Sequence, residues 1–472
     1  MNKLSWKTKV GYGLCSTAES IPYNLFYIFF LFFLTDVVGI SAVTAGIISG
    51  TAALWDSVID PPVGVLCDHT AKKSRLTWMK VCVLPLGLTI FLTFAPFEFG
   101  NAVVGFIYYT ILAMLVWTFY SAFVAPYYAL GSEITKDYNE RNKLWFFMNI
   151  VGYILFAFVS SGPMWIWDIA TNAGYNDRQA WGFTGTVFAV LICVLCAVGI
   201  RLLRNKESYS RKTVAPQKRD EEKRAKLNYY KTWKSCFKVK SFRKVVAWIL
   251  VYEIGFVMLN AVIVYMMTHN IGMDAAQQSV FWLVSTVVVV TSLPWLTFFG
   301  NKYGKKSVML ATSIPAAVAS ILFFVSRPDS ALPMYIYAGV WGVSSAAFYL
   351  FYITFAYDCI EIDEFISGVR KSGSITALAV FFDDIGAALG LYGAGLVLGL
   401  SGYDSSAYEQ SGRALQSIIT AGALFPGIFV TISILILMTY RVSKRKYELL
   451  RIATMKKKAG EEYSAEGFED IL

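Results

Sequence analysis

Charged side chains are scarce in this sequence. Asp, Glu, Lys and Arg make up 16% of the 472 residues, whereas hydrophobic residues make up 56%. A soluble domain carries nearer to about 25% charged residues. The apolar residues also lie in runs of roughly twenty or more, a length that matches the hydrocarbon layer of a bilayer and exceeds that of most core helices. The composition therefore excludes an ordinary soluble protein.

Motifs for metal binding and covalent chemistry are missing as well. The chain has two His and seven Cys, and we assign no role to His69 or His269. Cys193 and Cys196 form a Cys-x-x-Cys pattern inside an apolar run, where membrane packing explains them better than metal or redox chemistry. No phosphate-binding Gly-rich loop, zinc-ligand spacing or nucleophile elbow occurs outside the apolar runs. We therefore expect neither an enzyme nor an ATP-driven pump, and no cofactor other than a coupling ion.

The net charge of +10 does not indicate a nucleic-acid partner. The Lys and Arg residues lie between apolar runs, where they set membrane topology. The richest stretch, 201–244, holds 16 Lys or Arg against four acids. Because this stretch and every second loop are basic, we expect both termini to be cytoplasmic in a multi-pass protein of the plasma membrane.

Twelve apolar runs are long enough to cross a bilayer as helices, and the basic stretch divides them into six and six. We expect an all-α membrane protein with the major facilitator fold, two six-helix bundles around a midplane site. The boundaries are 1–203 for the first bundle, 204–243 for a cytoplasmic linker, 244–445 for the second bundle and 446–472 for a tail, disordered after about 455. The runs are about 14–35, 42–66, 78–96, 102–130, 145–168, 180–203, 245–268, 275–299, 307–326, 332–357, 373–400 and 414–440.

Two acids interrupt the second apolar run, in the segment Trp55-Asp56-Ser-Val-Ile-Asp60-Pro-Pro. Residues four apart lie on one face of a helix, one turn from each other. An unpaired carboxylate in hydrocarbon costs several kcal/mol, about 3 or more, so such acids are functional by default. Two close carboxylates share a proton or bind a cation. Ion pairing with another helix is the alternative, but the apolar runs contain few Lys or Arg. We therefore predict a coupling-ion site at Asp56 and Asp60.

A polar motif follows this helix: Gly64-Val-Leu-Cys-Asp68-His-Thr-Ala-Lys72-Lys73. It resembles the loop motif of the major facilitator superfamily, with Ala where a second Gly is usual. A weaker copy, Gly300-Asn-Lys-Tyr-Gly304-Lys-Lys, lies at the equivalent place in the second half. An acid beside cations at a helix end can hold neighbouring helices together in one state and release them in another. We predict gating roles for Asp68, Lys72, Lys73, Glu133, Arg141 and Arg370.

Four segments spread over nearly the whole chain resemble the glycoside–pentoside–hexuronide:cation symporters, the family of the melibiose carrier. They are Thr35-Asp36-Val-Val-Gly39, the Trp-Asp-x-x-x-Asp-Pro segment, Pro126-x-x-Ala-Leu-x-x-Glu133-Ile-Thr-x-Asp-x-x-x-Arg141, and Asp363-Glu364-x-x-x-Gly-x-Arg370. The resemblance implies symport of a sugar with Na⁺, H⁺ or Li⁺ by alternating access.

The family's ion site is only partly retained. The resemblance places its paired acids at Asp56 and Asp60 and its helix-4 hydroxyl at Ser121. Two further oxygen donors of the melibiose carrier are replaced by Ile59 and Val124. Na⁺ needs several oxygen ligands, whereas a proton needs one carboxylate. We therefore favour H⁺, with Na⁺ at Asp56 and Asp60 as the alternative.

The sugar site departs further from the family. The positions of the family's acid, Arg and Lys hold Ser20 (beside Glu19), Asn149 and Asp384 (beside Asp383). Aromatic side chains suit stacking on a pyranose ring, although packing is an equally common role. The predicted substrate residues are Glu19, Ser20, Tyr27, Tyr120, Tyr128, Asn149, Tyr349, Asp383 and Asp384.

The loss of the Arg and the Lys, with the gain of Asp383 and Asp384, makes the predicted pocket more acidic. Such a pocket repels carboxylates and sulfates. We expect a monomeric carrier, surrounded by lipid, that imports a neutral saccharide or related small solute. Two alternatives stay open: a proton-coupled carrier of a cationic or amphiphilic solute, and a transporter-like sugar sensor that signals through its basic loop.

Overall fold

The computed structural model describes residues 4–69, 75–135, 138–204, 229–368, 372–405, 407, 409–459 and 461–471. Within these residues every regular element is a helix. The elements of the first half are α1 (Trp6–Cys15), α2 (Thr17–Asn24), η1 (Leu25–Phe30), η2 (Phe33–Val37), α3 (Ala42–His69), α4 (Arg75–Phe94), α5 (Ala102–Glu133), α6 (Tyr138–Asn172) and α7 (Asp177–Leu203).

The second half continues the all-helical pattern. Its elements are α10 (Tyr229–Cys236), α11 (Lys240–Tyr265), η4 (Met266–Asn270), α12 (Ala275–Tyr303), α13 (Lys305–Ser326), α14 (Ala331–Ser367), α15 (Ser372–Leu400), α16 (Gly412–Ile419), η5 (Thr420–Leu424), α17 (Phe425–Met438), α18 (Lys444–Ala459) and η6 (Glu469–Ile471). Each of the twelve predicted apolar runs coincides with one of these helices or with a consecutive series of them.

Eleven helical segments in the described part of the chain are long and apolar enough to cross a membrane. The remaining one of the twelve predicted helices is the first along the chain, 14–35. It is built instead from four successive pieces, α1, α2, η1 and η2. The all-α membrane fold is thus confirmed, and the chain is a multi-pass membrane protein.

Local chemistry explains why the first helix is interrupted. The hydroxyls of Ser16 and Thr17 donate to the carbonyls of Gly13 and Leu14, each at 2.7 Å, where α1 passes into α2. Such side-chain bonds compete with the regular helical ladder. Pro22 lies inside α2 and has no N–H to donate. Two π-helical stretches, η1 and η2, follow, and π-helical turns occur frequently at functional sites.

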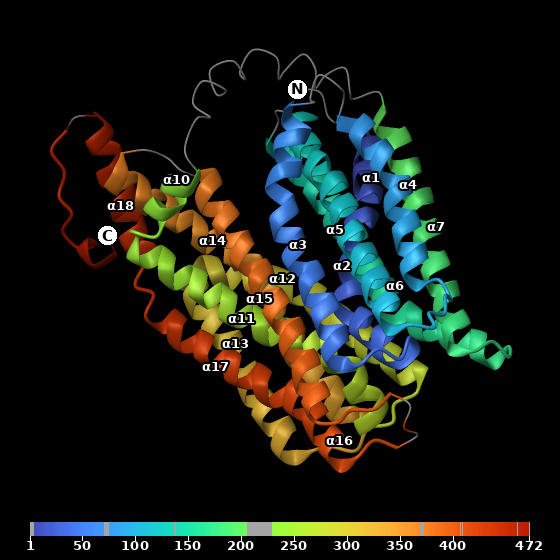
Figure 1. The fold of residues 1–472 in the computed structure, drawn as a ribbon. Helices are drawn as coiled ribbons and strands as arrows, with labels where there is room; N and C mark the ends of the chain where they lie inside the picture. Colours follow the sequence, from blue (N-terminus) through green and yellow to red (C-terminus); the bar gives the residue numbers. More distant parts are fainter. Residues whose placement is uncertain are drawn as a thin grey trace. The chain divides into compact units, whose positions relative to one another are not determined.

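The chain divides into two compact units. Unit 1 contains Met1–Lys223, Asn260–Thr286 and Leu391–Ile418. In it α3 packs on α5, α5 on α4, α4 on α7, and α7 on both α1 and α6, and these helices run side by side in Figure 1. Unit 1 therefore holds Asp56, Asp60 and Ser121 on directly packed helices.

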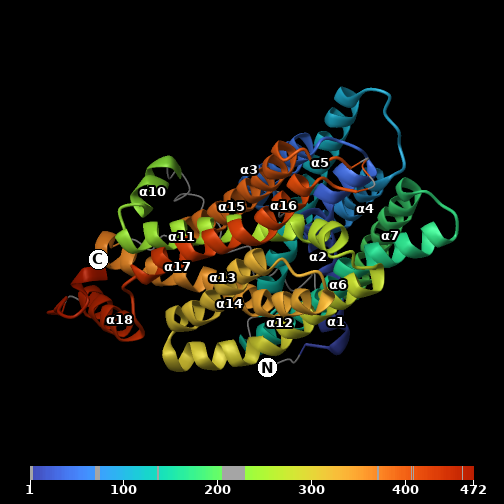
Figure 2. The same ribbon diagram turned by 90° about the horizontal axis from the view of Figure 1, so that it is seen from below.

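Unit 2 contains Arg224–Leu259, Val287–Gly390 and Ile419–Leu472. Its α13 packs between α14 and α17, as Figure 2 also shows. The tail contradicts the predicted disorder after about 455. There, Phe468 and Ile471 are each 1% exposed, the Ser241 hydroxyl donates to the Ile471 carbonyl at 3.1 Å, and Lys446 pairs with Asp470 at 2.6 Å. Two apolar side chains in the charged tail thus anchor it.

Candidate functional site

The predicted ion-site residues come together on α3 and α5. The Ser121 hydroxyl donates to Oδ1 of Asp56 at 2.9 Å, and it also interacts with Asp60. Asp56 is 7% exposed and Ser121 is 2% exposed, whereas Asp60 is exposed. The hydroxyl thus holds Asp56, and the second carboxyl group, that of Asp60, follows one helical turn later on the same helix face. This arrangement can hold a proton or a small cation between the acids.

A second hydrogen bond joins α3 and α5 at the residue before Asp56. The indole N–H of Trp55 donates to the hydroxyl oxygen of Thr118 at 2.9 Å. Next to it, Tyr120 interacts electrostatically with Asp56 and with Glu19. Tyr120, itself a predicted substrate residue, therefore lies within electrostatic range of both Asp56 and Glu19.

Glu19 and Tyr128 form the closest contact among the predicted substrate residues. The Tyr128 hydroxyl donates to Oε1 of Glu19 at 2.5 Å, while Oε2 of Glu19 is buried and has no hydrogen-bond partner among the described residues. The Tyr128 ring is 37% exposed and lies 5.6 Å from the Trp145 ring, centroid to centroid. An exposed ring beside an acceptor oxygen offers both stacking and hydrogen bonding to a sugar.

Three other predicted residues of unit 1 have different surroundings. Ser20 faces Gly152 of α6. A methyl group added at Gly152 would lie 3.6 Å from the hydroxyl oxygen of Ser20. Asn149, exposed on the same helix, donates from its side-chain amide to the Trp145 carbonyl at 2.7 Å. Tyr27 is 6% exposed, and its ring packs at a tilt against that of Tyr23, with the ring centroids 4.5 Å apart, which is an environment typical of packing.

The remaining predicted residues, Tyr349, Asp383 and Asp384, belong to unit 2. The Tyr349 hydroxyl donates at 3.1 Å to Glu253 on α11, and Glu253 interacts electrostatically with both aspartates. Sequence reasoning missed Glu253. The signal was present, because Glu253 interrupts the run 245–268 just as Asp56 interrupts the run 42–66.

The predicted gating residues lie outside what the structure describes. Residues 72, 73 and 370 are not described, and neither are the side chains of Asp68, Glu133 and Arg141. The second copy of the loop motif is described. Lys305 pairs with Asp358 of α14 at 2.7 Å, and Asp358 also accepts from the Tyr440 hydroxyl at 3.0 Å. We call these three residues the Lys305 latch; its acid was not predicted from the sequence.

The turn before α13 requires glycine. Gly304 precedes the helix with φ of 88°, a left-handed conformation that residues with a Cβ adopt rarely. Lys306, which follows, donates to the Tyr440 and Met438 carbonyls at 2.6 and 2.9 Å. The Gly-Lys-Lys sequence therefore places two successive cations, Lys305 against α14 and Lys306 against the end of α17.

A polar cluster in unit 1 connects the end of η2 to segments from the second half of the chain. Oδ1 of Asp36 accepts from the Tyr403 hydroxyl at 2.5 Å and lies 3.3 Å from Nε2 of His269. The hydroxyls of Thr35 and Tyr265 are 2.5 Å apart. We call these five residues the Asp36 clasp. The sequence offered no reason to pair His269 with Asp36, because the two are far apart along the chain.

Glu140 of α6 binds the N-terminal segment of unit 1. Its carboxylate accepts from the Leu4 amide at 3.0 Å and pairs with Lys9 at 2.9 Å and Lys143 at 2.8 Å. Hydrogen bonds from Lys143 and Lys9 lower the pKa of Glu140 from the ordinary 4.5 to about 2. The carboxylate is therefore charged at any physiological pH.

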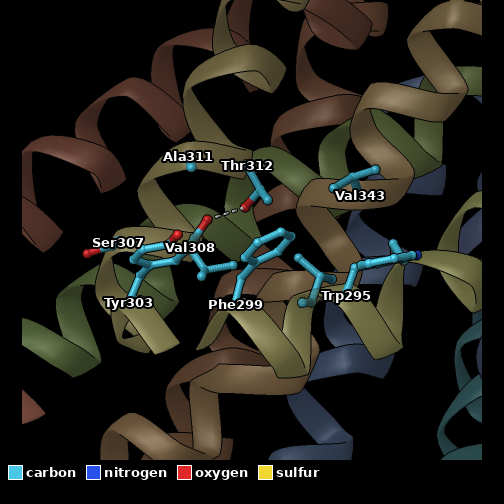
Figure 3. Close-up of a pocket in the computed structure, with 10 residues that line it drawn as sticks. Trp295, Phe299, Tyr303, Ser307, Val308, Ala311, Thr312 and Val343 are labelled. Atoms are coloured by element: carbon cyan, nitrogen blue, oxygen red, sulfur yellow. Dashed lines mark hydrogen bonds between the residues drawn. The ribbon is translucent and has the colours of Figure 1, made fainter. Parts of the chain in front are cut away.

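An apolar groove on unit 2 has a different character. Its volume is about 520 Å³, and aromatic side chains of α12, Trp295, Phe299 and Tyr303, line it opposite α13 and Val343 (Figure 3). Trp295 is 63% exposed. The Thr312 hydroxyl donates back to its own helix at the Val308 carbonyl, at 3.1 Å. The groove thus lacks the convergent polar groups that a sugar site needs.

Comparison with known proteins connects this geometry to a family. Residues 11–444 match the family described as MFS/sugar transport protein. The isoprimeverose transporter of Lactiplantibacillus pentosus is 24% identical over 95% of this chain and 91% of its own. A putative glycoside/cation symporter of Escherichia coli is 24% identical over 96% of both chains.

The fold also matches solved transporters. The crystal structure of a D-xylose–proton symporter superposes with a TM-score of 0.62 at 13% identity, over 93% of this chain and 97% of its own. That likeness confirms the major facilitator fold. Because the family match spans most of the sequence, the chain belongs to the MFS/sugar transport family, as a transporter of the glycoside–pentoside–hexuronide:cation symporter type.

Proposed function

We propose that this protein imports a sugar or glycoside together with a cation by alternating access. The proposal rests above all on two carboxyl groups, Asp56 and Asp60, that lie one turn apart on the membrane-spanning helix α3, with the Ser121 hydroxyl of α5 hydrogen-bonded to Asp56. Relatives named as sugar transporters and symporters support the same function. We further propose that the carrier acts as a monomer with both termini cytoplasmic.

The charge of the site gives the coupling its physical basis. Two ionised carboxylates in a low-dielectric layer repel each other and lose hydration. Binding one cation removes most of this cost, so the loaded and empty states differ in how easily the helices move. Because linkage is reciprocal, the cation raises solute affinity as much as the solute raises cation affinity.

We propose that the coupling ion is a proton. Na⁺ takes several oxygen ligands, whereas a proton needs one. The neighbouring side chains Ile59 and Val124 supply no oxygen, and Val124 is 9% exposed, within the helix packing. Asp56 or Asp60 alone is sufficient to hold a proton.

We propose a neutral saccharide as the solute, held in unit 1 by Glu19 and Tyr128. Oε2 of Glu19 has no partner among described residues and can accept a hydroxyl from the sugar, while the exposed Tyr128 ring offers a face for stacking. An anionic sugar would lie against Glu19 and be repelled. A cationic solute is the second candidate, favoured by this same acid.

The test is uptake into proteoliposomes with an imposed H⁺ or Na⁺ gradient, applied one at a time. The panel contains neutral glycosides, glucuronides and amines. We expect the H⁺ gradient to drive accumulation of a neutral glycoside and to leave glucuronides outside. Preferential uptake of glucuronides would refute the substrate proposal. Uptake that responds to neither gradient would refute symport.

A further inference from the structure

Glu253 is a fully buried acid with one unused oxygen. It lies on the membrane-spanning part of α11, in unit 2, and is 0% exposed. Its Oε1 accepts the Tyr349 hydroxyl at 3.1 Å. Its Oε2 is buried and has no hydrogen-bond partner in the described chain. A buried polar atom without a partner carries its full desolvation cost, which indicates that something else satisfies it.

Close helix packing brings a second acid to the same place. A methyl group added at Gly386 of α15 would lie 2.9 Å from Cβ of Glu253, and one at Gly390 would lie 2.8 Å from the Ile254 carbonyl oxygen. Only glycine allows two helix backbones to approach this closely. Asp383, three residues before Gly386, shares its helix face. Its Oδ1 is also buried without a hydrogen-bond partner among the described residues.

Among the described residues, the titratable groups that interact with these two acids are acidic or neutral. Asp384 on α15 and Tyr352 on α14 both interact electrostatically with Glu253. The adjacent Tyr252 is engaged with the Ser344 hydroxyl at 2.9 Å. Within the described ranges no Lys or Arg forms an ion pair with Glu253 or Asp383, and Lys305 of the same unit pairs with Asp358.

This arrangement needs a positive charge that the described side chains do not supply. Ionised carboxylates at Glu253 and Asp383 in a membrane interior repel each other and have lost their hydration. One bound cation would satisfy Oε2 of Glu253 and Oδ1 of Asp383 together. The tyrosine hydroxyls donate hydrogen bonds but carry no compensating charge.

We propose that Glu253 and Asp383, with Asp384 beside them, form a second cation site that binds one inorganic monovalent cation, H⁺ or Na⁺. This site belongs to unit 2 and uses none of the residues of the Asp56–Asp60 site in unit 1. It goes beyond the proposed function, because it requires neither a sugar nor coupling at Asp56. If both sites are loaded in each cycle, two cations accompany one solute.

Infrared difference spectroscopy on the purified full-length protein tests the site with ions alone. The probe is the C=O stretch of a protonated carboxyl group, recorded in Na⁺-free buffer at about pH 7, where an ordinary carboxylate is ionised. We expect wild type to show a band that is lost in Glu253→Gln and shifted or lost in Asp383→Asn. Asp329→Asn, at an exposed loop position, should leave the band unchanged.

A second arm identifies the cation. If addition of Na⁺ removes the Glu253-dependent band, Na⁺ replaces the proton at this site; if the band persists, the site is a proton site. The proposal is overturned if neither Glu253→Gln nor Asp383→Asn changes any carboxyl band and neither alters thermal stabilisation of the protein by Na⁺. Asp56→Asn should keep the Glu253 band, so failure of the coupling-site proposal and failure of this one are separable. Elution as a single species on size exclusion confirms that each variant is folded.

Discussion

At the scale of single residues, the Ser121 hydroxyl is the group of α5 that forms a hydrogen bond with an acid of α3, Asp56. It donates to Asp56 at 2.9 Å from a position that is 2% exposed. A hydrogen bond to a charged group contributes roughly 1.5–3 kcal/mol, more than one between neutral partners. One hydroxyl has a single proton to donate and cannot satisfy two ionised carboxylates, which is why we propose that a cation binds there.

Ser121→Ala should weaken binding of the coupling ion. Losing about 1.5 kcal/mol corresponds to about a tenfold rise in the ion concentration that gives half-maximal uptake. Uptake kinetics at varied pH or Na⁺ measure this directly. Thr110→Val is a matched control on the same helix, because among the described residues the Thr110 hydroxyl donates only to the Phe106 carbonyl. Equal half-saturation in wild type and Ser121→Ala would contradict the assigned role.

Glu140→Gln should destabilise the protein in a pH-dependent way. The pKa of Glu140 is lowered from 4.5 to about 2 in the folded protein. The contribution of a carboxylate with a lowered pKa is present above its unfolded value and is lost as pH falls through the folded one. Glu140→Gln should therefore unfold at lower temperature than wild type near neutral pH, and the gap should close between about pH 4.5 and about 2.

Thermal unfolding in detergent across this pH range tests the Glu140 prediction. Lys7→Gln is a suitable control, because the exposed Lys7 takes no part in the ion pairs of Glu140. A gap between wild type and Glu140→Gln that stays constant as pH falls would show that the loss comes from packing and not from charge.

At the scale of the elements, the Lys305 latch holds the start of α13 against α14. Lys305→Ala leaves Asp358, whose side chain is 13% exposed, without its cation. An uncompensated, partly buried charge costs on the order of 2 kcal/mol, so thermal unfolding should fall by about 5 °C. The double variant Lys305→Ala/Asp358→Asn should recover much of the loss. Strictly additive losses in the double variant would rule out the latch.

The elements were predictable because hydropathy alone specifies them. Runs such as 42–66 and 180–203 coincide with α3 and α7, since a helix is the structure that satisfies its own backbone in lipid. The interruption of the first helix was missed, because it depends on hydroxyls that bond locally at Ser16 and Thr17. Partners such as Asp358 for Lys305 could not be predicted, since no periodicity links residues from separate helices.

Part of the site was also predictable, because acids that interrupt apolar runs are visible in the sequence. Asp56, Asp60 and Ser121 share helix faces that spacing and resemblance identify, and the structure places them together. Glu253 was accessible to the same argument about acids in apolar runs but was overlooked. The nearness of Asp383 to Glu253 was beyond sequence reasoning, since it depends on how Gly386 lets two helices approach.

At the scale of the whole molecule, each compact unit carries acids within its membrane-spanning helices: Asp56 and Asp60 in unit 1, and Glu253 and Asp383 in unit 2. A carrier that couples an ion to a solute must change the charge state of such groups once per cycle. Such a cycle is consistent with the match of this chain to the MFS/sugar transport family. The central claim is that Asp56 and Asp60 carry out the coupling.

The most direct measurement compares accumulation with exchange in the same proteoliposomes. Wild type should concentrate the solute under an imposed cation gradient. Asp56→Asn and Asp60→Asn should lose concentrative uptake at least tenfold while still exchanging labelled for unlabelled solute, because a neutral side chain removes coupling and not the pathway. Asp168→Asn, at an exposed position, should behave as wild type. Undiminished gradient-driven accumulation in both Asp56→Asn and Asp60→Asn would contradict the account.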